Sequence, residues 1–190
     1  MPQVIDAVMS RRSDRHFSKR PLEREVIDTL LEAFRWAPSS NNRQPWRLLI
    51  ADSAQARAVY DDALSEGNKL WTPAAALKMV VIGNPAEQPD RDGLQCFMLD
   101  CGLALENMLI QGYALGLTIH AMVGWNSEKI TRGFRIPAPM RPVALVAAGY
   151  RGRVEDLPEE VRVKDLRTRT RKTIEEFVVR DGFAAPEPGS

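Results

Sequence analysis

Cysteine and histidine are both scarce in this chain of 190 residues, which has two of each. Cys96 and Cys101 lie five positions apart in one predicted helix and on different faces of it, which is too far apart for a disulfide. We expect two buried thiols in a reducing compartment. His16 and His120 have no metal-ligand spacing to each other or to the cysteines, so no metal site is predicted and structural roles are expected for both.

The sequence also lacks an excess of charge and a segment suited to crossing a membrane. A net charge of +1 gives no general attraction for nucleic acid or an anionic membrane, so we expect neither as a partner. The most hydrophobic stretch, residues 94–117, contains Asp100 and Glu106, which are costly in lipid, and is better explained as a core helix. Residues 1–14 show no secretory signal, so a cytoplasmic protein is expected.

Three common catalytic and nucleotide-binding motifs are absent. The chain has no Gly-x-Ser-x-Gly elbow, no phosphate loop ending in Gly-Lys-Ser/Thr, and no Gly-x-Gly-x-x-Gly after a strand. Hydrolase and kinase activities therefore lose their usual support. Without a dinucleotide fingerprint, any NAD(P)H is expected to be a visiting substrate rather than a cofactor held in a Rossmann fold.

Hydrophobic periodicity predicts interspersed helices and strands, and therefore a mixed fold. Helices are expected over residues 4–9, 21–34, 54–66, 94–117 and 127–133, and strands over residues 46–51, 77–82, 118–123 and 142–148. Pro21 is expected in the first turn of its helix and Pro38 just after its end. The nearly continuous apolar run of residues 77–82 predicts a central strand, and a turn is expected around Gly67 and Asn68.

The composition changes after Tyr150. Residues 151–176 contain eight Arg or Lys and seven Asp or Glu, without an amphipathic stripe before residues 174–179. We therefore expect one domain over residues 1–190 in which about 151–190 stay outside the main core. Such a tail is either disordered or an arm that lies on a partner subunit.

Three arginines and a hydroxyl fall within five residues near the start of the chain, at Arg11, Arg12, Ser13 and Arg15. A guanidinium group presents a rigid fork of donors that fits phosphate oxygens, and a hydroxyl completes the shell around an anion. The cluster therefore indicates a phosphate site. The alternative from these residues alone is a solvated loop, because charged runs are common on surfaces.

A second polar cluster follows the predicted helix over residues 21–34. It holds hydroxyls and amides on a stiff frame between two prolines, followed by Trp46. Neutral, directional groups of this kind suit a planar heteroaromatic ring with carbonyl and imine edges. A plain turn anchored by Trp46 is equally compatible with the pattern. The candidate ring contacts are Pro38, Ser39, Ser40, Asn42 and Gln44.

Arginines recur at every second position in the tail, at Arg167, Arg169 and Arg171. An extended backbone would place them on one face, roughly 6.6 Å apart, where they could meet one anion. A disordered basic patch is the alternative.

Residues 11–17 and 37–46 resemble the Arg-Arg-Ser-x-Arg-x-Phe and Ala-Pro-Ser-Ser-x-Asn-x-Gln-Pro-Trp segments of the nitroreductase (flavin reductase) family. Arg171 is similar to the closing arginine of that family, which precedes a short apolar strand. The resemblance implies an α+β fold with a central, mostly antiparallel sheet flanked by helices. It also implies a homodimer that binds two FMN molecules at the subunit interface, with a C-terminal arm extending onto the partner subunit.

The resemblance also implies roles for individual residues. Those near the FMN phosphate and the pyrimidine edge of the flavin would be Arg11, Arg12, Ser13, Arg15, Arg169 and Arg171. Those approaching the flavin ring from the other subunit would be Pro38, Ser39, Ser40, Asn42 and Gln44. Asn68 would lie near the pyrimidine edge, and Val123 and Gly124 near the reactive N5 side. Val123 stands where some relatives carry an acidic residue, so a carboxylate role is lost there.

The implied activity is FMN-dependent oxidoreduction, in which a hydride passes from NAD(P)H through flavin to a small electron-poor acceptor such as a nitroaromatic, quinone or enone. The flavin carries the chemistry, so no catalytic side chain is predicted. Two alternatives stay open: a specialised enzyme of the same fold that dehalogenates its substrate or fragments the flavin, and a flavin-binding sensor or carrier without turnover. A phosphate- or RNA-binding module is disfavoured by the near-neutral charge.

Overall fold

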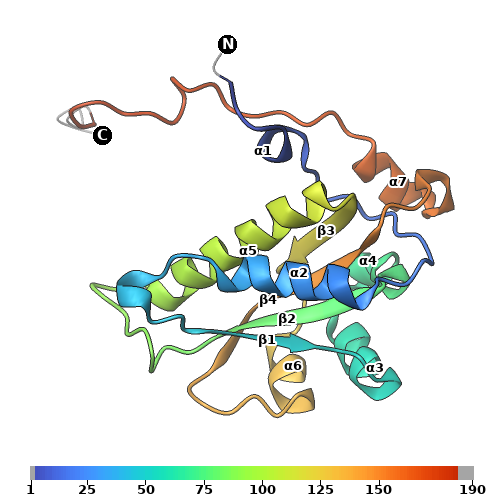
Figure 1. Ribbon diagram of the computed structural model, residues 1–190, viewed down its shortest axis with the longest axis horizontal. Helices are drawn as coiled ribbons and strands as arrows, with labels where there is room; N and C mark the ends of the chain where they lie inside the picture. The colour runs from blue at the N-terminus through green and yellow to red at the C-terminus, as the bar shows by residue number, and fades with distance from the viewer. Residues whose placement is uncertain (1–2, 184–190) are drawn as a thin grey trace, which may run out of the picture.

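Four strands form one antiparallel sheet in the order β1-β2-β4-β3. The strands are β1 (Trp46–Ile50), β2 (Leu77–Gly83), β3 (Leu117–Met122) and β4 (Arg141–Tyr150). The computed structural model describes residues 3–183, and helices cover both faces of the sheet (Figure 1). The predicted antiparallel α+β fold is confirmed.

Strand β2 lies inside the sheet, and all of its residues are buried. Its alternating side chains serve two separate cores, as the period of two in a strand requires. Met79 and Val81 pack in the core beneath the long helices, whereas Val80 and Ile82 pack in the core on the other face. The prediction of a central strand at residues 77–82 is confirmed.

Helices α2 (Arg24–Arg35) and α5 (Cys96–Ala114) pack together over one face of the sheet, and the short α1 (Asp6–Ser10) lies against α5. Leu30 and Phe34 of α2 are buried there, as are the free thiols Cys96 and Cys101 of α5. The long apolar segment is thus a core helix, as predicted. In the part of the chain described here, no helix has the length and hydropathy needed to cross a bilayer.

The prediction that Pro21 lies in the first turn of α2 is wrong, because the helix begins at Arg24. The N-cap residue Glu23 has an extended backbone, and its carboxylate accepts hydrogen bonds of 2.6 Å from Arg20 and from the Tyr150 hydroxyl. These bonds, the one from Tyr150 first, lower the Glu23 pKa to about 2. Residues 20–23 are therefore tied to the end of β4 before the helix starts.

Helices α3 (Ala54–Ala63) and α6 (Ser127–Gly133) cover the other face of the sheet. Side chains cap both: Ser53 accepts from the Ala56 amide, and Asn126 accepts from the Lys129 amide. Between α3 and β2, residues expected to form a turn make a short helix, α4 (Glu66–Lys69). It forms because the Ser65 carbonyl accepts from the amides of Asn68 and Lys69.

The tail does not leave the core where the sequence predicted. A 3-10 turn, η3 (Val154–Asp156), leads into α7 (Glu159–Asp165), whose Val161 is buried in the core on the α3 face. Val161 and Asp165 are the buried residues of α7 and lie four positions apart on one face of it. Two residues, one of them charged, are too few to show an amphipathic stripe in the sequence. The expectation that everything after Tyr150 stays off the core is therefore wrong for residues 154–165.

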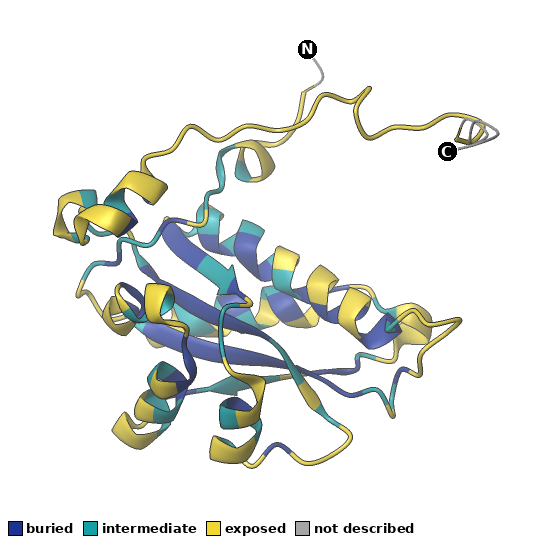
Figure 2. Cartoon of the chain, turned by 180° about the vertical axis from the view of Figure 1, so that it is seen from behind, coloured by how far each residue is buried: buried dark blue, intermediate teal, exposed yellow. Residues whose placement is uncertain are grey.

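Beyond α7 the chain runs over the outside of the molecule, and residues 167–183 are all exposed (Figure 2). Residues 174–179, which follow Arg171, form bends and turns. Residues 184–190 of the predicted arm lie outside the described residues.

Candidate functional site

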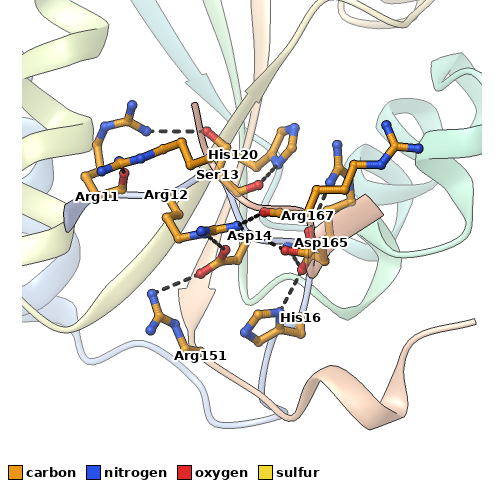
Figure 3. A network of polar contacts seen from close by, with 11 residues as sticks. Arg11, Arg12, Ser13, Asp14, His16, His120, Arg151, Asp165 and Arg167 are labelled. Carbon is orange, nitrogen blue, oxygen red and sulfur yellow. Dashed lines mark hydrogen bonds and ion pairs between the residues drawn. The ribbon is translucent and has the colours of Figure 1, made fainter. Parts of the chain in front are cut away.

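The arginine loop and the tail form the two walls of one cavity of about 330 Å³. Residues 11–15 come from the loop after α1, and residues 164–171 come from the end of α7 and the start of the tail (Figure 3). The structure thus places arginines from opposite ends of the sequence together. The cavity is lined by Arg11, Arg12, Ser13, Asp14, Arg15, Lys164, Asp165, Arg167, Thr168, Arg169, Thr170 and Arg171.

Arg12 is largely engaged in holding the two walls together. Its Nη2 donates to the carbonyl oxygens of Asp165 at 3.1 Å and Arg167 at 3.0 Å, and its Nε faces Asp14 at 3.4 Å. Arg169 makes the reciprocal contact, donating from Nη1 to the Arg11 carbonyl at 2.6 Å. These bonds fix the tail beside the loop.

Arg15 is held by a buried carboxylate that the sequence did not suggest. Asp165, at the end of α7, is 2% exposed in its side chain and accepts from Nη1 of Arg15 at 2.9 Å. The other oxygen of the same carboxylate accepts from the Arg15 backbone amide and from His16 Nδ1. A lone aspartate 150 positions away in a charged segment offers no local pattern that would have revealed this pairing.

The second histidine supports the loop from the sheet. His120 of β3 donates from Nδ1 to the carbonyl oxygen of Ser13 at 2.8 Å, and its ring lies 4.7 Å from that of Trp71. Burial, and then the nearby charge of Arg15, lower the His120 pKa. The ring is therefore a neutral donor near pH 7. Among residues 3–183, no three His, Cys, Asp or Glu side chains are arranged to hold a metal ion.

The second predicted cluster forms a strained turn around η1 (Ser40–Asn42). Asn41, Asn42 and Gln44 have φ values of 52°, 55° and 50°, in the left-handed region that non-glycine residues rarely adopt. The Ser39 hydroxyl holds the turn by accepting from the Gln44 amide at 3.0 Å. Strain of this kind concentrates at binding sites.

Asp100 of α5 lies beneath this turn and is 3% exposed. Its Oδ1 accepts from the Ser40 amide at 3.3 Å, whereas its buried Oδ2 has no hydrogen-bond partner in the described part of the chain. A buried carboxylate oxygen without a donor is costly, which makes the turn an incomplete polar site. In the sequence this aspartate was notable only as a charge within an apolar helix.

The two clusters do not meet within one chain. Figure 1 shows the turn around η1 beside the start of α5, at the opposite end of the molecule from α7, whose last residues line the arginine cavity. The polar turn is tied to Asp100 near the start of α5, and α1, which leads into the arginine loop, packs on α5 near its end through the 2.8 Å bond from Tyr113 to Asp6.

The remaining candidates lie together on a third segment. Asn68 of α4 donates from Nδ2 to the Gly124 carbonyl at 3.0 Å, and the Ser65 amide donates to the same oxygen. Val123 beside it is 83% exposed. Val123 and Gly124 directly follow β3, which carries His120, so they are connected through that strand to the support of the arginine loop.

Comparison with known proteins agrees with the fold and the two sequence segments. Residues 8–86 match the Nitroreductase family. An "oxidoreductase containing FMN" of known structure superimposes with a TM-score of 0.86 at 26% identity, over 97% of this chain and 95% of the other. Residues 8–86 are thus similar to the nitroreductase family, and the chain as a whole shares the fold of this FMN-containing oxidoreductase.

Two curated relatives carry different names. A protein of Archaeoglobus fulgidus named "Putative NADH dehydrogenase/NAD(P)H nitroreductase" is 27% identical over 79% of this chain and 86% of its own length. The 5,6-dimethylbenzimidazole synthase of Rhodospirillum rubrum is 28% identical over 84% of this chain and 87% of its own length.

Proposed function

We propose that this chain is an FMN-dependent oxidoreductase that works as a homodimer, passing a hydride from NAD(P)H through the flavin to a small electron-poor acceptor. The observation that carries the proposal is the cavity in which six arginines and one lysine surround space for an anion. The family match and the FMN-containing structural relative support the same cofactor.

The donor set fits the phosphate of FMN. A phosphate monoester carries a charge near −2 and accepts several charge-assisted hydrogen bonds. Arg11 and Arg15 from the loop, with Arg169 and Arg171 from the tail, would hold it, and the Ser13 hydroxyl would complete the shell. Arg12, engaged with two carbonyl groups, would serve mainly to keep the walls in place.

The strained turn would supply the neutral contacts to the flavin ring. Pro38, Ser40 and Asn42 are exposed there, so their groups are accessible to a ligand. Since the turn lies at the opposite end of the chain from the arginine cavity, the ring contacts would come from a second copy. Asn68 and the Val123–Gly124 segment would approach the ring from the same chain as the arginines.

Exposed apolar side chains at α1 and along α5 support pairing of two copies. They are between 40% and 66% exposed, which is unusual for so many large apolar residues on neighbouring helices of a monomer. The residues are Val4, Ile5, Val8, Met9, Met98, Leu99 and Leu103. The exposed apolar side chains of the tail, among them Ile174 and Phe177, would then lie on the partner as an arm.

Bound FMN would accept a hydride from the nicotinamide and deliver electrons to the acceptor. The chain itself would bind, orient and shield the cofactor rather than act as an acid or a base. At position 123 a valine offers no carboxylate, so only the backbone of that segment is available to the ring.

The visible absorption spectrum of freshly purified protein, before and after incubation with FMN, tests the cofactor. We expect a yellow protein with one FMN per chain, and steady NAD(P)H oxidation once a quinone or nitroaromatic is added. A protein that stays colourless in excess FMN would refute the proposal. A yellow protein without turnover of any acceptor would instead indicate a sensor or carrier.

The relative named 5,6-dimethylbenzimidazole synthase favours a second candidate, in which the site consumes its own flavin. Incubating the FMN-loaded protein with NADH and oxygen distinguishes the two. Loss of total flavin, with dimethylbenzimidazole detected by mass spectrometry, would indicate flavin fragmentation. Constant flavin with continued NADH oxidation would indicate the reductase.

A further inference from the structure

A carboxylate stands in the wall of the cationic cavity, where it opposes the binding of any anion. Asp165 lines the cavity with six arginines and Lys164, and its side chain is only 2% exposed. Charges in a poorly solvated site interact more strongly than in water. Charge alone therefore predicts that Asp165 weakens phosphate binding.

Three donors from two consecutive loop residues converge on this one carboxylate. Oδ1 accepts from Nη1 of Arg15 at 2.9 Å, and Oδ2 accepts from the Arg15 backbone amide at 2.9 Å and from His16 Nδ1 at 2.7 Å. Three of the roughly four acceptor positions of the carboxylate are thereby used within the protein.

The contacts fix both ends of Arg15. Asp165 holds the backbone amide and one nitrogen of the guanidinium group, and the Trp71 ring lies 5.9 Å from the guanidinium carbon. A free arginine side chain loses rotamer entropy when a ligand immobilises it. An arginine already held in place does not incur that loss on binding.

The end of α7 is itself anchored to the loop. Arg12 of the loop donates to the Asp165 carbonyl at 3.1 Å. The loop thus binds the backbone of Asp165, and the side chain of Asp165 binds the loop. The backbone position of Asp165 is thus set by a contact that does not involve Arg15.

We propose that Asp165 is a positioning residue for the FMN phosphate, which strengthens phosphate binding by holding Arg15 although its own charge opposes it. The inference rests on the proposed function, because it presumes that the anion is the phosphate of FMN. It assigns the end of helix α7 to the cofactor site, in addition to the arginines.

The sign of one substitution separates positioning from charge. Asp165→Asn removes the negative charge and the ion pair, and the dissociation constants of FMN and riboflavin are measured on the flavin-free protein by fluorescence quenching. We expect FMN affinity to fall by about 10-fold to 100-fold, as for loss of a charged hydrogen bond, while riboflavin, which has no phosphate, changes less than about twofold.

Glu160→Gln is the matched control. Glu160 lies in the first turn of the same helix, α7, is exposed and does not line the cavity. Its substitution removes the same charge, and we expect FMN affinity within about twofold of that of the unmodified protein. If Asp165→Asn also binds FMN as tightly or more tightly, the positioning role is refuted.

A structural role would give another result. If Asp165→Asn weakens FMN and riboflavin equally, Asp165 supports the fold and not the phosphate, which also refutes the inference. Should that variant not fold, Asp165→Glu keeps the charge and displaces the carboxylate by one methylene. We expect it to weaken FMN alone, and unchanged FMN affinity would overturn the inference. If the unmodified protein binds no FMN, the proposed function itself fails.

Discussion

The side-chain amide of Asn68 donates to the carbonyl oxygen of Gly124 at 3.0 Å, so helix α4 fixes the path of the chain just after β3. The fit is tight, because a Cβ on Gly124 would lie 2.9 Å from Nδ2 of Asn68 and 3.0 Å from the Ser65 hydroxyl. Asn68 and Ser65 therefore hold the backbone at Gly124, while the neighbouring Val123 is exposed.

We predict that Asn68→Ala weakens FMN and riboflavin by the same factor, about 5-fold to 10-fold, because the lost hydrogen bond, worth about 1 kcal/mol, supports the ring and not the phosphate. Flavin fluorescence titrations measure both. Gly67→Ala in the same helix is the control, since a Cβ there meets nothing within 4 Å. A loss confined to FMN would contradict this assignment.

Arg11→Ala and Arg15→Ala are each expected to lower FMN affinity by about 10-fold to 100-fold, because a charged hydrogen bond to phosphate contributes roughly 1.5–3 kcal/mol. Riboflavin affinity is expected to change little. Arg24→Ala, whose side chain is 86% exposed on α2, serves as the control for loss of one positive charge. Normal flavin retention by both cavity variants after purification would exclude a phosphate role.

Leu99→Arg is expected to separate the two copies, because it places a charge among the exposed apolar side chains at α1 and along α5, where Leu99 is 57% exposed. Light scattering coupled to gel filtration measures the mass, and a shift toward 21.3 kDa with loss of bound flavin is the expected outcome. Ala58→Arg, exposed on α3 across the sheet, should leave the mass unchanged. An unchanged dimer in Leu99→Arg would place the interface elsewhere.

Gly152→Ala is expected to destabilise the fold and disturb the arginine loop together. An added Cβ would lie 2.5 Å from the carbonyl carbon and oxygen of Phe17, which are backbone atoms and cannot swing away. The Gly152 amide also donates to the His16 carbonyl at 2.8 Å, so the displacement reaches the loop. We expect a loss of about 1–3 kcal/mol in the free energy of unfolding, measured with urea. A Gly152→Ala variant as stable as the wild type would show that the chain around Gly152 moves away from Phe17 at little cost.

Stability is expected to fall as the pH drops below about 6.5, in part because of His120. Burial and the charge of Arg15 lower the pKa of His120 in the folded chain, so the unfolded chain takes up a proton that the folded chain does not. The contribution of the neutral ring is therefore complete above the unfolded pKa and declines as the pH falls toward the folded one.

His120→Gln keeps a donor for the Ser13 carbonyl and does not titrate, so the free energy of unfolding should depend less steeply on pH in this range. Urea unfolding at about pH 7.5 and about pH 5.5 compares the slopes. Parallel slopes for the two proteins would mean that His120 gains its proton as readily in the folded chain.

Local pattern was enough to predict most of the fold. The nearly continuous apolar run of residues 77–82 forms the central strand β2, and the apolar stripe of α2 places Leu30 and Phe34 in the core, both as expected. Pattern failed where a contact with a distant residue decided the outcome. Glu23 is bound to Tyr150 across 127 positions just before the late start of α2, and Asn68 is bound to Gly124 across 56 positions where α4 replaces the predicted turn.

The site was predicted by its composition and missed in its internal structure. The close spacing of three arginines predicted a phosphate site at residues 11–15, and the structure places these residues beside Arg169 and Arg171. Nothing local indicated that Asp165, His16 and His120 would hold the loop, because their hydrogen bonds join residues more than 100 positions apart or involve backbone atoms. The local sequence shows which side chains a site contains, whereas their arrangement depends on contacts between distant parts of the chain.

In the proposed homodimer, the separation of the arginine cavity from the strained turn would link cofactor loading to the amount of protein present. A pocket finished by a neighbouring molecule exists only while the two remain associated, so each bound FMN would also act as a bridge that slows their parting. Dilution would then release flavin and subunits together, and abundant cofactor would hold assembled a pair that the apolar helices alone leave in equilibrium.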